Sequence, residues 1–220
     1  VDEADVLLVE STYGNRVHEA DDNGARMAQI INETADRHGK VIIPAFALGR
    51  IEEVLYWIGR LEAEQRIPVL PVYVDSPMAR EVLGIYRSRL QELDGDVAGQ
   101  RFNHGRERNY LKVCAFCTEQ LRVVSSVPES RAVQESTEPA IIVSSSGMAT
   151  GGRVLHHLVH TLPDERNTVL FVGYQAAGTR GRQMLEGVGF TRIHGADVPV
   201  KARIEAIDSM SAHADSNEIL

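Results

Sequence analysis

Apolar and polar positions alternate along this chain in two distinct patterns. Short apolar runs predict buried strands at residues 40–43, 71–74, 120–124, 140–143 and 168–172. Between the runs, apolar residues recur every three or four positions and predict helices at residues 20–38, 50–65, 76–90, 128–134 and 153–161. Strands that alternate with amphipathic helices are typical of an α/β fold. We therefore expect a mostly parallel, Rossmann-like sheet with helices on both faces.

The pattern changes near both ends and in one internal stretch. Residues 4–9 form an apolar run that predicts a further buried strand, whereas the last ten residues resemble a helix start capped by Asp215 or Ser216. Residues 191–194 and 198–207 flank a turn and predict a hairpin. Residues 92–117 are polar and lack a period, so we expect an excursion from the core. A first strand without a partner and a helix cut short lead us to expect a piece of a larger protein.

Composition narrows the classes of protein that fit. Hydrophobic residues make up 43% of the 220 residues and charged residues 25%, which is typical of a globular domain. No apolar run approaches the roughly 20 residues of a membrane-spanning helix, so we expect no membrane partner. The formal net charge of −8 argues against a general electrostatic attraction to nucleic acid, so any such contact needs a local basic surface.

One stretch of the chain could supply a local basic surface. It contains Arg101, His104, Arg106, Arg108 and Lys112, interleaved with Phe102 and Tyr110. Because Glu107 lies inside it and the charge density is modest, a solvated loop is the simpler interpretation.

The two cysteines carry little functional signal. Cys114 and Cys117 have the spacing of half a zinc site, but no second pair of ligands follows at a suitable distance. Two cysteines cannot build a disulfide framework, so a reducing, cytoplasmic compartment is the expectation.

Two segments near the chain ends could carry acid–base chemistry. Glu10 follows the first predicted strand and precedes two hydroxyl residues and a glycine turn, so its carboxylate could orient a histidine or receive a proton. His213 lies in a small-residue loop between Ser211 and Asp215, where it could act as a general acid or a metal ligand. Taken alone, each is also compatible with a capping or structural role.

Two further segments follow predicted strands and have residues that could bind an anion. Arg50, near a helix start, could clamp a phosphate, although it could equally pair with Glu52 or Glu53 on its own helix. Residues 144–152 form a serine- and glycine-rich loop whose amides and hydroxyls could surround a phosphate, but the loop lacks the lysine and spacing of a P-loop.

The remaining polar residues are better explained by local structure. Asp75 and Ser76 precede a proline at a predicted helix start, which favours plain helix capping for both. His156, His157 and His160 share one predicted helix without a carboxylate partner in the pattern, so we interpret them as surface or packing residues.

Taken in order, six segments resemble the β-CASP branch of the metallo-β-lactamase superfamily, and in particular RNA-processing enzymes similar to the cleavage-and-polyadenylation endonuclease. They are VESTYGNR, IPAFALGR, VYVDSPMA, VSSSGMATGGRVLHHL, FVGYQAAGTRGR and SMSAHAD. The resemblance places Glu10 on the motif A acid and His213 on the motif B histidine. It implies a β-CASP domain at residues 16–207, with residues 1–15 and 208–220 as short flanks, including flanking strands, of a metallo-β-lactamase domain.

The same resemblance implies an activity for the parent protein: hydrolysis of RNA phosphodiesters at a site with two Zn²⁺ ions. The ligands of those ions fall outside this chain, so we expect the chain alone to bind no metal, to cleave no RNA and to hold Glu10 and His213 only loosely. RNA is the implied partner, with Arg50 and the loop residues Ser144, Ser145, Ser146, Gly147 and Met148 as phosphate contacts. A homodimer of the full-length protein is compatible with the resemblance, and exonuclease or endonuclease action is left open.

Two other functions fit parts of the sequence. One is a non-catalytic RNA-binding or scaffold subunit of the same superfamily, because the diagnostic ligands lie outside the chain. The other is a stand-alone sugar-phosphate or nucleotide-sugar enzyme, which requires a complete core and a ligand at the Ser144 loop.

Overall fold

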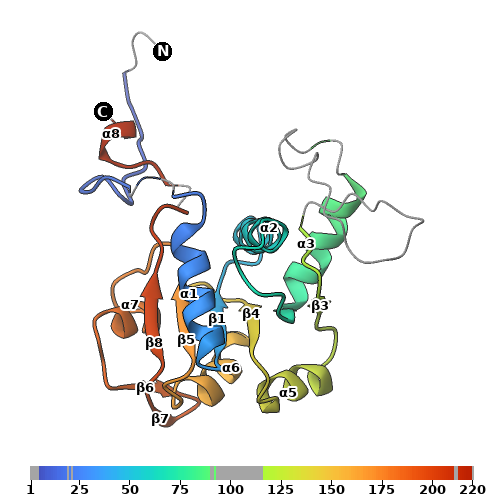
Figure 1. The fold of residues 1–220 in the computed structure, drawn as a ribbon. Helices are drawn as coiled ribbons and strands as arrows, with labels where there is room; N and C mark the ends of the chain where they lie inside the picture. The colour runs from blue at the N-terminus through green and yellow to red at the C-terminus, as the bar shows by residue number, and fades with distance from the viewer. Residues whose placement is uncertain are drawn as a thin grey trace.

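A parallel six-stranded sheet forms the centre of the molecule (Figure 1). The computed structural model describes residues 5–18, 20, 22–89, 92, 116–210 and 213–219. The strand order is β3-β2-β4-β1-β5-β8, and every pair of neighbours runs parallel. The strands are β1 (Lys40–Pro44), β2 (Val72–Asp75), β3 (Leu121–Val123), β4 (Ala140–Ser144), β5 (Thr168–Phe171) and β8 (Arg203–Ala206). The predicted α/β class is confirmed.

Helices cover both faces of this sheet, as the alternating pattern predicts. They are α1 (Ala25–Asp36), α2 (Arg50–Ala63), α3 (Pro77–Ser88), α5 (Val127–Glu135), α6 (Val154–Thr161) and α7 (Arg180–Leu185), whereas α8 (Ser216–Ile219) lies beside the N-terminal segment, away from the sheet (Figure 1). Five of these match predicted helices, and α8 begins where the sequence indicates, because Asp215 Oδ1 accepts the Asn217 and Glu218 amides. α7 has six residues, too few to produce a periodic pattern.

Alternation along each strand creates two hydrophobic cores. In β1, Val41 and Ile43 pack with apolar residues of α1, α2 and α3, whereas Ile42 packs with those of α5, α6 and α7. β4 and β5 alternate in the same way. Because all five positions of β1 and of β4 are buried, these strands read as continuous apolar runs, which is the signature of a parallel sheet covered on both faces.

The predicted hairpin is only partly correct. β6 (Phe190–Ile193) and β7 (Ala196–Pro199) pair antiparallel around His194 and Gly195, which both have positive φ, as a tight two-residue turn requires. The second predicted strand, however, does not continue to residue 207. The amides of Lys201 and Ala202 both donate to the Leu162 carbonyl and turn the chain back to the main sheet, where β8 pairs with β5.

The first predicted strand is wrong for the residues described. Val6, Leu7 and Leu8 are 77%, 77% and 93% exposed, and residues 5–10 form no strand. Apolar character alone predicted burial, but no described part of the chain covers the side chains of Val6, Leu7 and Leu8. Instead, the following residues run beside the C-terminal segment, where Tyr13 and Asp215 form an isolated parallel bridge (Figure 1).

Some sequence predictions fall outside the described residues. These include Cys114 and the basic residues Arg101, His104, Arg106, Arg108 and Lys112. Among the residues described, no helix is long and apolar enough to cross a membrane.

A buried carboxylate in α2 makes the stability of this fold depend on pH. Glu62 is 6% exposed, and its only hydrogen bond to a described residue comes from the Glu119 amide, 2.9 Å away. Burial raises the pKa of Glu62 to about 7. The folded chain therefore binds the proton of the Glu62 carboxyl more tightly than the unfolded chain, where this carboxyl has its ordinary, lower pKa. The free energy of unfolding falls as the pH rises from the pKa of the unfolded chain to that of the folded chain.

We predict that Glu62→Gln stabilises the chain at about pH 8 by about 1–3 kcal/mol and leaves it unchanged at about pH 4, because glutamine keeps the hydrogen bond without the buried charge. Urea unfolding at the two pH values measures the difference. Glu64→Gln is the matched control, since Glu64 is exposed and already paired with Arg60 and Arg66. A variant whose pH dependence equals that of the parent chain would contradict the prediction.

Candidate functional site

The segments that the sequence singled out after strands β1, β2 and β4 meet at the carboxyl end of the parallel sheet. β4 lies between β2 and β1, so the loops that follow these three strands are neighbours. After β1 the chain enters α2 on one face, and after β4 it enters α6 on the other. Parallel α/β proteins commonly bind ligands where the chain diverges in this way at the carboxyl end of the sheet.

The serine loop after β4 is held from both sides. The Ser144 hydroxyl donates to the Asp75 carbonyl over 2.7 Å, and the Ser145 hydroxyl donates to Ser76 Oγ over 2.9 Å. Further along, the Gly147 carbonyl accepts from Gln175 Nε2, 3.0 Å away. The loop therefore has a fixed shape before any ligand arrives.

Gly147 is needed for this arrangement because of its neighbour Phe46. A Cβ atom at Gly147 would lie 3.1 Å from the Phe46 ring, so even alanine would crowd it. Ser146 contacts Thr150, with 3.2 Å between their hydroxyl oxygens, and the Met148 carbonyl accepts the Gly181 amide. Of the five residues predicted as phosphate contacts, Ser144 is the buried last residue of β4, and the other four form one ordered turn in which Gly147 is also buried.

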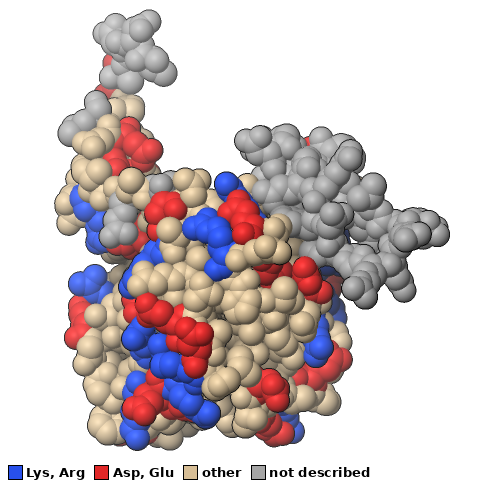
Figure 2. Space-filling model, viewed as in Figure 1, with Lys and Arg blue, Asp and Glu red and all other residues tan. Residues whose placement is uncertain are grey.

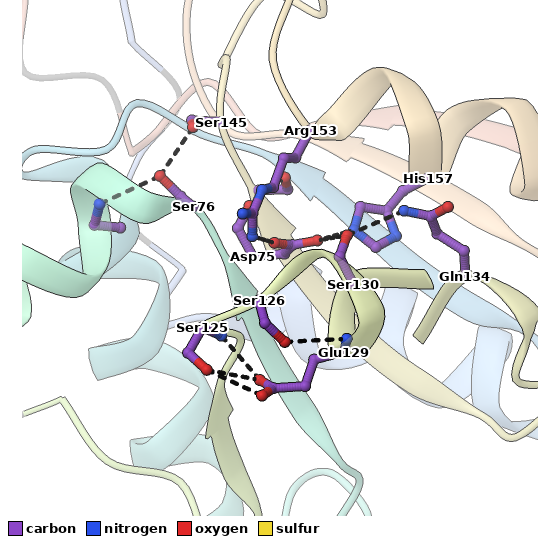
Figure 3. Close-up of polar contacts among 12 residues, drawn as sticks. Asp75, Ser76, Ser125, Ser126, Glu129, Ser130, Gln134, Ser145, Arg153 and His157 are labelled. Atoms are coloured by element: carbon purple, nitrogen blue, oxygen red, sulfur yellow. Dashed lines mark hydrogen bonds and ion pairs between the residues drawn. The ribbon is translucent and has the colours of Figure 1, made fainter. Parts of the chain in front are cut away.

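A buried ionic cluster lies directly beneath this loop, centred on Asp75 at the end of β2 (Figure 3). Its Oδ1 accepts from Arg153 Nη1 over 2.6 Å, and its Oδ2 accepts from His157 Nε2 over 2.7 Å. The Ser130 hydroxyl also donates to Oδ2. Asp75 and His157 have no exposed surface, whereas the Arg153 side chain is 23% exposed.

Asp75 remains ionised despite this burial. Burial raises the pKa of its carboxyl, but the hydrogen bonds from His157, Ser130 and Arg153 together outweigh burial and hold the pKa below its usual value. The charge of Asp75 is therefore present at neutral pH, and the cluster is lost only when acid protonates this carboxylate.

The sequence interpretation of this cluster was partly wrong. Ser76 does cap α3, since its hydroxyl accepts the Ala79 amide, but the Asp75 side chain caps nothing. His157 is not a plain packing residue either, because Asp75 is its carboxylate partner. The detectable signal was the i,i+4 spacing of Arg153 and His157, which puts two donors on one helix face opposite a polar residue that ends a buried strand.

Arg50 lies at the same end of the sheet but already has protein partners. Its Nη1 donates to the Glu53 carboxylate and to the Met210 carbonyl, and its side chain is 13% exposed. These contacts connect the start of α2 to the segment that follows β8. The alternative that Arg50 pairs with its own helix is therefore realised in the structure.

Glu10 and His213 are brought together from opposite ends of the chain. His213 Nδ1 lies 3.4 Å from Glu10 Oε2, and the Ala214 amide donates to Glu10 Oε1 over 2.6 Å. Both side chains are about half exposed. The two side chains therefore lie together in this chain, and the segments that carry them are also linked by other contacts. How loosely the pair is held stays a prediction.

Three hydrogen bonds between the two segments provide that link, and a ring contact inside the first segment supports them. The fully buried Tyr13 ring packs edge-on against His18, with ring centroids 4.9 Å apart. The His18 amide donates to Asp215 Oδ2 over 2.8 Å, and His18 Nε2 lies 2.7 Å from the His213 carbonyl. The Ser216 amide donates to the Arg16 carbonyl. His213 thus has a fixed backbone position beside Glu10.

Hydrogen bonds determine the charge of Glu10. The Thr12 amide, 3.0 Å from Glu10 Oε2, is the main cause of the lowered pKa of this carboxyl, and the Ala214 amide and His213 act in the same direction. Glu10 is therefore an anion at neutral pH. It can accept a hydrogen bond from the His213 ring, but it is not itself a proton donor there.

The described residues offer neither a group of metal ligands nor, on the face drawn in Figure 2, a basic patch. Among the residues that the structure describes, no group of three or more His, Cys, Asp or Glu side chains could hold a metal ion, so these residues do not fit a zinc centre. On the face of the molecule drawn in Figure 2, Lys and Arg side chains are interspersed with Asp and Glu rather than gathered in one patch. That face therefore presents no continuous basic patch to a polyanion.

Comparison with known sequences identifies the family. Residues 51–184, more than half of the chain, match the model of the Beta-Casp domain. The chain belongs to the Beta-Casp family. In addition, residues 197–220 match the model described as "Zn-dependent metallo-hydrolase RNA specificity domain". The Beta-Casp match covers the serine loop and the Asp75 cluster, and the second match contains His213.

Curated relatives of this Beta-Casp chain carry names from RNA metabolism. It is 36% identical to "Ribonuclease TTHA0252" of Thermus thermophilus over 99% of this chain and 48% of that protein. It is 32% identical to "Transcription termination factor FttA" of Methanocaldococcus jannaschii, over 98% of this chain and 34% of that protein. An "RNase J-like protein" of the same organism is 32% identical over 100% of this chain and 49% of its own length. The chain thus spans between a third and a half of these relatives.

Proposed function

We propose that the protein containing this chain is a zinc-dependent ribonuclease that processes RNA in the cytoplasm, and that this Beta-Casp domain binds the RNA. The observation that carries the proposal is the Glu10–His213 pair, held 3.4 Å apart by segments from both ends of the chain, on positions that resemble the acidic and histidine motifs of the family. The names of the relatives and the description of the second family model support the substrate class.

In this proposal His213 supplies a proton to the leaving oxygen of the RNA or stabilises the negative charge that develops on it. Glu10 orients the imidazole and stays ionised. Zinc would be held by other parts of the protein, because the described residues supply no metal site. Two further predictions stand beside this proposal. The chain divides into residues 1–15, 16–207 and 208–220, of which the two outer segments belong to a metallo-β-lactamase domain. The full-length protein forms a homodimer.

The RNA would lie along the carboxyl end of the sheet. There, the turn is already ordered, and its partly exposed residues Ser145, Ser146 and Met148 would meet the phosphate groups, whereas Ser144 and Gly147 are buried and support the turn. Arg50 is retained as a proposed phosphate contact, although RNA would have to use guanidinium nitrogens other than the Nη1 that holds Glu53 and the Met210 carbonyl.

The direct test of this function is an RNA hydrolysis assay. The full-length protein is expected to hydrolyse single-stranded RNA, to lose that activity with a zinc chelator and to regain it when zinc is added. The 220-residue chain alone, with zinc supplied, is expected to remain inactive. A full-length protein that binds RNA but never cleaves it would favour the alternative of a non-catalytic RNA-binding subunit, and one that does neither would refute the proposal.

The roles of Glu10 and His213 can be separated from zinc binding. In the full-length protein His213→Ala is expected to lower kcat by roughly 10²–10⁴-fold, the usual contribution of a positioned acid, while the zinc content stays the same. Glu10→Gln is expected to act in the same direction but less strongly. His18→Ala serves as a control for loss of the supporting contacts. Unchanged kcat in His213→Ala would exclude this histidine from the reaction.

A further inference from the structure

The guanidinium of Arg153 makes a hydrogen bond to the described residues from one of its three nitrogen atoms. It precedes α6 and donates from Nη1 to the buried Asp75 carboxylate over 2.6 Å. Its Nε and Nη2 form no hydrogen bond with any residue in the described part of the chain, and 23% of its side-chain surface is exposed. One side of this planar cation is therefore fixed in the protein, and donors remain for an anion.

Asp75 restricts how that cation can be oriented. The carboxylate has no exposed surface and is held in place by His157 and Ser130 on its other oxygen (Figure 3). Arg153 cannot swing away without leaving a buried charge with fewer donors, which is costly. The side chain therefore loses little further conformational freedom when it binds a ligand.

Arg153 lies next to the serine loop. The amide of Val154, the next residue, donates to the Ser145 carbonyl, so the Arg153 backbone runs beside Ser145. The Ser145 hydroxyl in turn donates a hydrogen bond to the Ser76 hydroxyl at the start of α3 (Figure 3). The Arg153 backbone and the Asp75 carboxylate that holds its guanidinium thus both lie beside the point where the hydroxyl groups of Ser145 and Ser76 meet.

We propose that Arg153 binds a backbone phosphate of single-stranded RNA through its free guanidinium N–H groups, with Asp75 as the positioning residue. This inference rests on the proposed function. A guanidinium presents parallel N–H groups that match two phosphate oxygens, which a lysine ammonium cannot reproduce. Arg153 is also better suited to this contact than Arg50, whose Nη1 is shared between Glu53 and a carbonyl and whose side chain is less exposed.

Affinity for single-stranded RNA over a range of salt concentrations tests the assignment in the full-length protein. Arg153→Ala is expected to weaken binding by roughly 10–100-fold, since charge-assisted hydrogen bonds are lost, and to reduce the slope of log affinity against log salt by about 0.7, the value for one phosphate contact on a single strand. Arg153→Lys is expected to recover the slope but only part of the affinity. KM should rise more than kcat falls.

Arg166→Ala is the matched control. Arg166 also pairs with an aspartate, Asp164, at 2.6 Å, but it is exposed and precedes β5 at the amino end of the sheet. The Arg166→Ala substitution removes the same charge and the same kind of ion pair, but at a position away from the serine loop. It is therefore expected to leave RNA affinity and the salt slope unchanged.

Each outcome decides the proposal. If the parent protein binds RNA and Arg153→Ala binds it with the same affinity and salt slope, Arg153 is structural and the assignment fails while the proposed function stands. If the parent protein does not bind RNA, both fail.

A measurement on the parent protein covers the case in which Arg153→Ala does not fold. Modification by an arginine-selective dicarbonyl reagent, read by mass spectrometry, is expected to be blocked by RNA at Arg153 and not at Arg166. Equal modification of Arg153 with and without RNA, or none in either state, would overturn the assignment.

Discussion

The Asp75 carboxylate is a charge without contact with water, and the arrangement of the loops around it depends on satisfying that charge. Burying an ionised group costs several kcal/mol unless donors replace its hydration. Asp75 obtains its donors from Ser130 in α5 and from Arg153 and His157 at α6, while its own carbonyl accepts from Ser144 after β4. The side chain of Asp75 thereby connects β2 to α5 and α6, and its backbone carbonyl adds a link to the end of β4.

A second, independent constraint holds the ends of the chain. Tyr13 is fully buried and contacts the rings of His18, Tyr174 and His213, although the preceding residues of its segment are exposed. Its backbone bridge to Asp215 explains why Glu10 and His213 meet across more than 200 residues of sequence. Both constraints operate where the strands end, which is where the proposed RNA contacts lie.

The sequence predicted most of the sheet because local patterns decide it. Strands such as β1 and β4 are buried on both faces and read as unbroken apolar runs, and Ser76 caps α3 as its type and position indicate. The Asp75–His157 pair was not predicted in this way, since 82 residues separate its members and the spacing of Arg153 and His157 marks a helix face without naming its carboxylate partner. For the run at residues 4–9, hydrophobicity predicted burial, but burial needs a partner surface that the described residues do not offer.

Hydrogen exchange of backbone amides in the full-length protein tests the central claim, that Asp75 fixes the loops at the carboxyl end. Asparagine at this position would set an amide donor against the donors of Arg153 and His157. Asp75→Asn is therefore expected to speed exchange about 10-fold or more in residues 76–80 and 144–157, with β5 and α1 unchanged, because the effect is local opening. Asp164→Asn, which breaks the exposed pair with Arg166, is the control. Unchanged exchange around Asp75, or a uniform increase throughout the domain, would contradict the account.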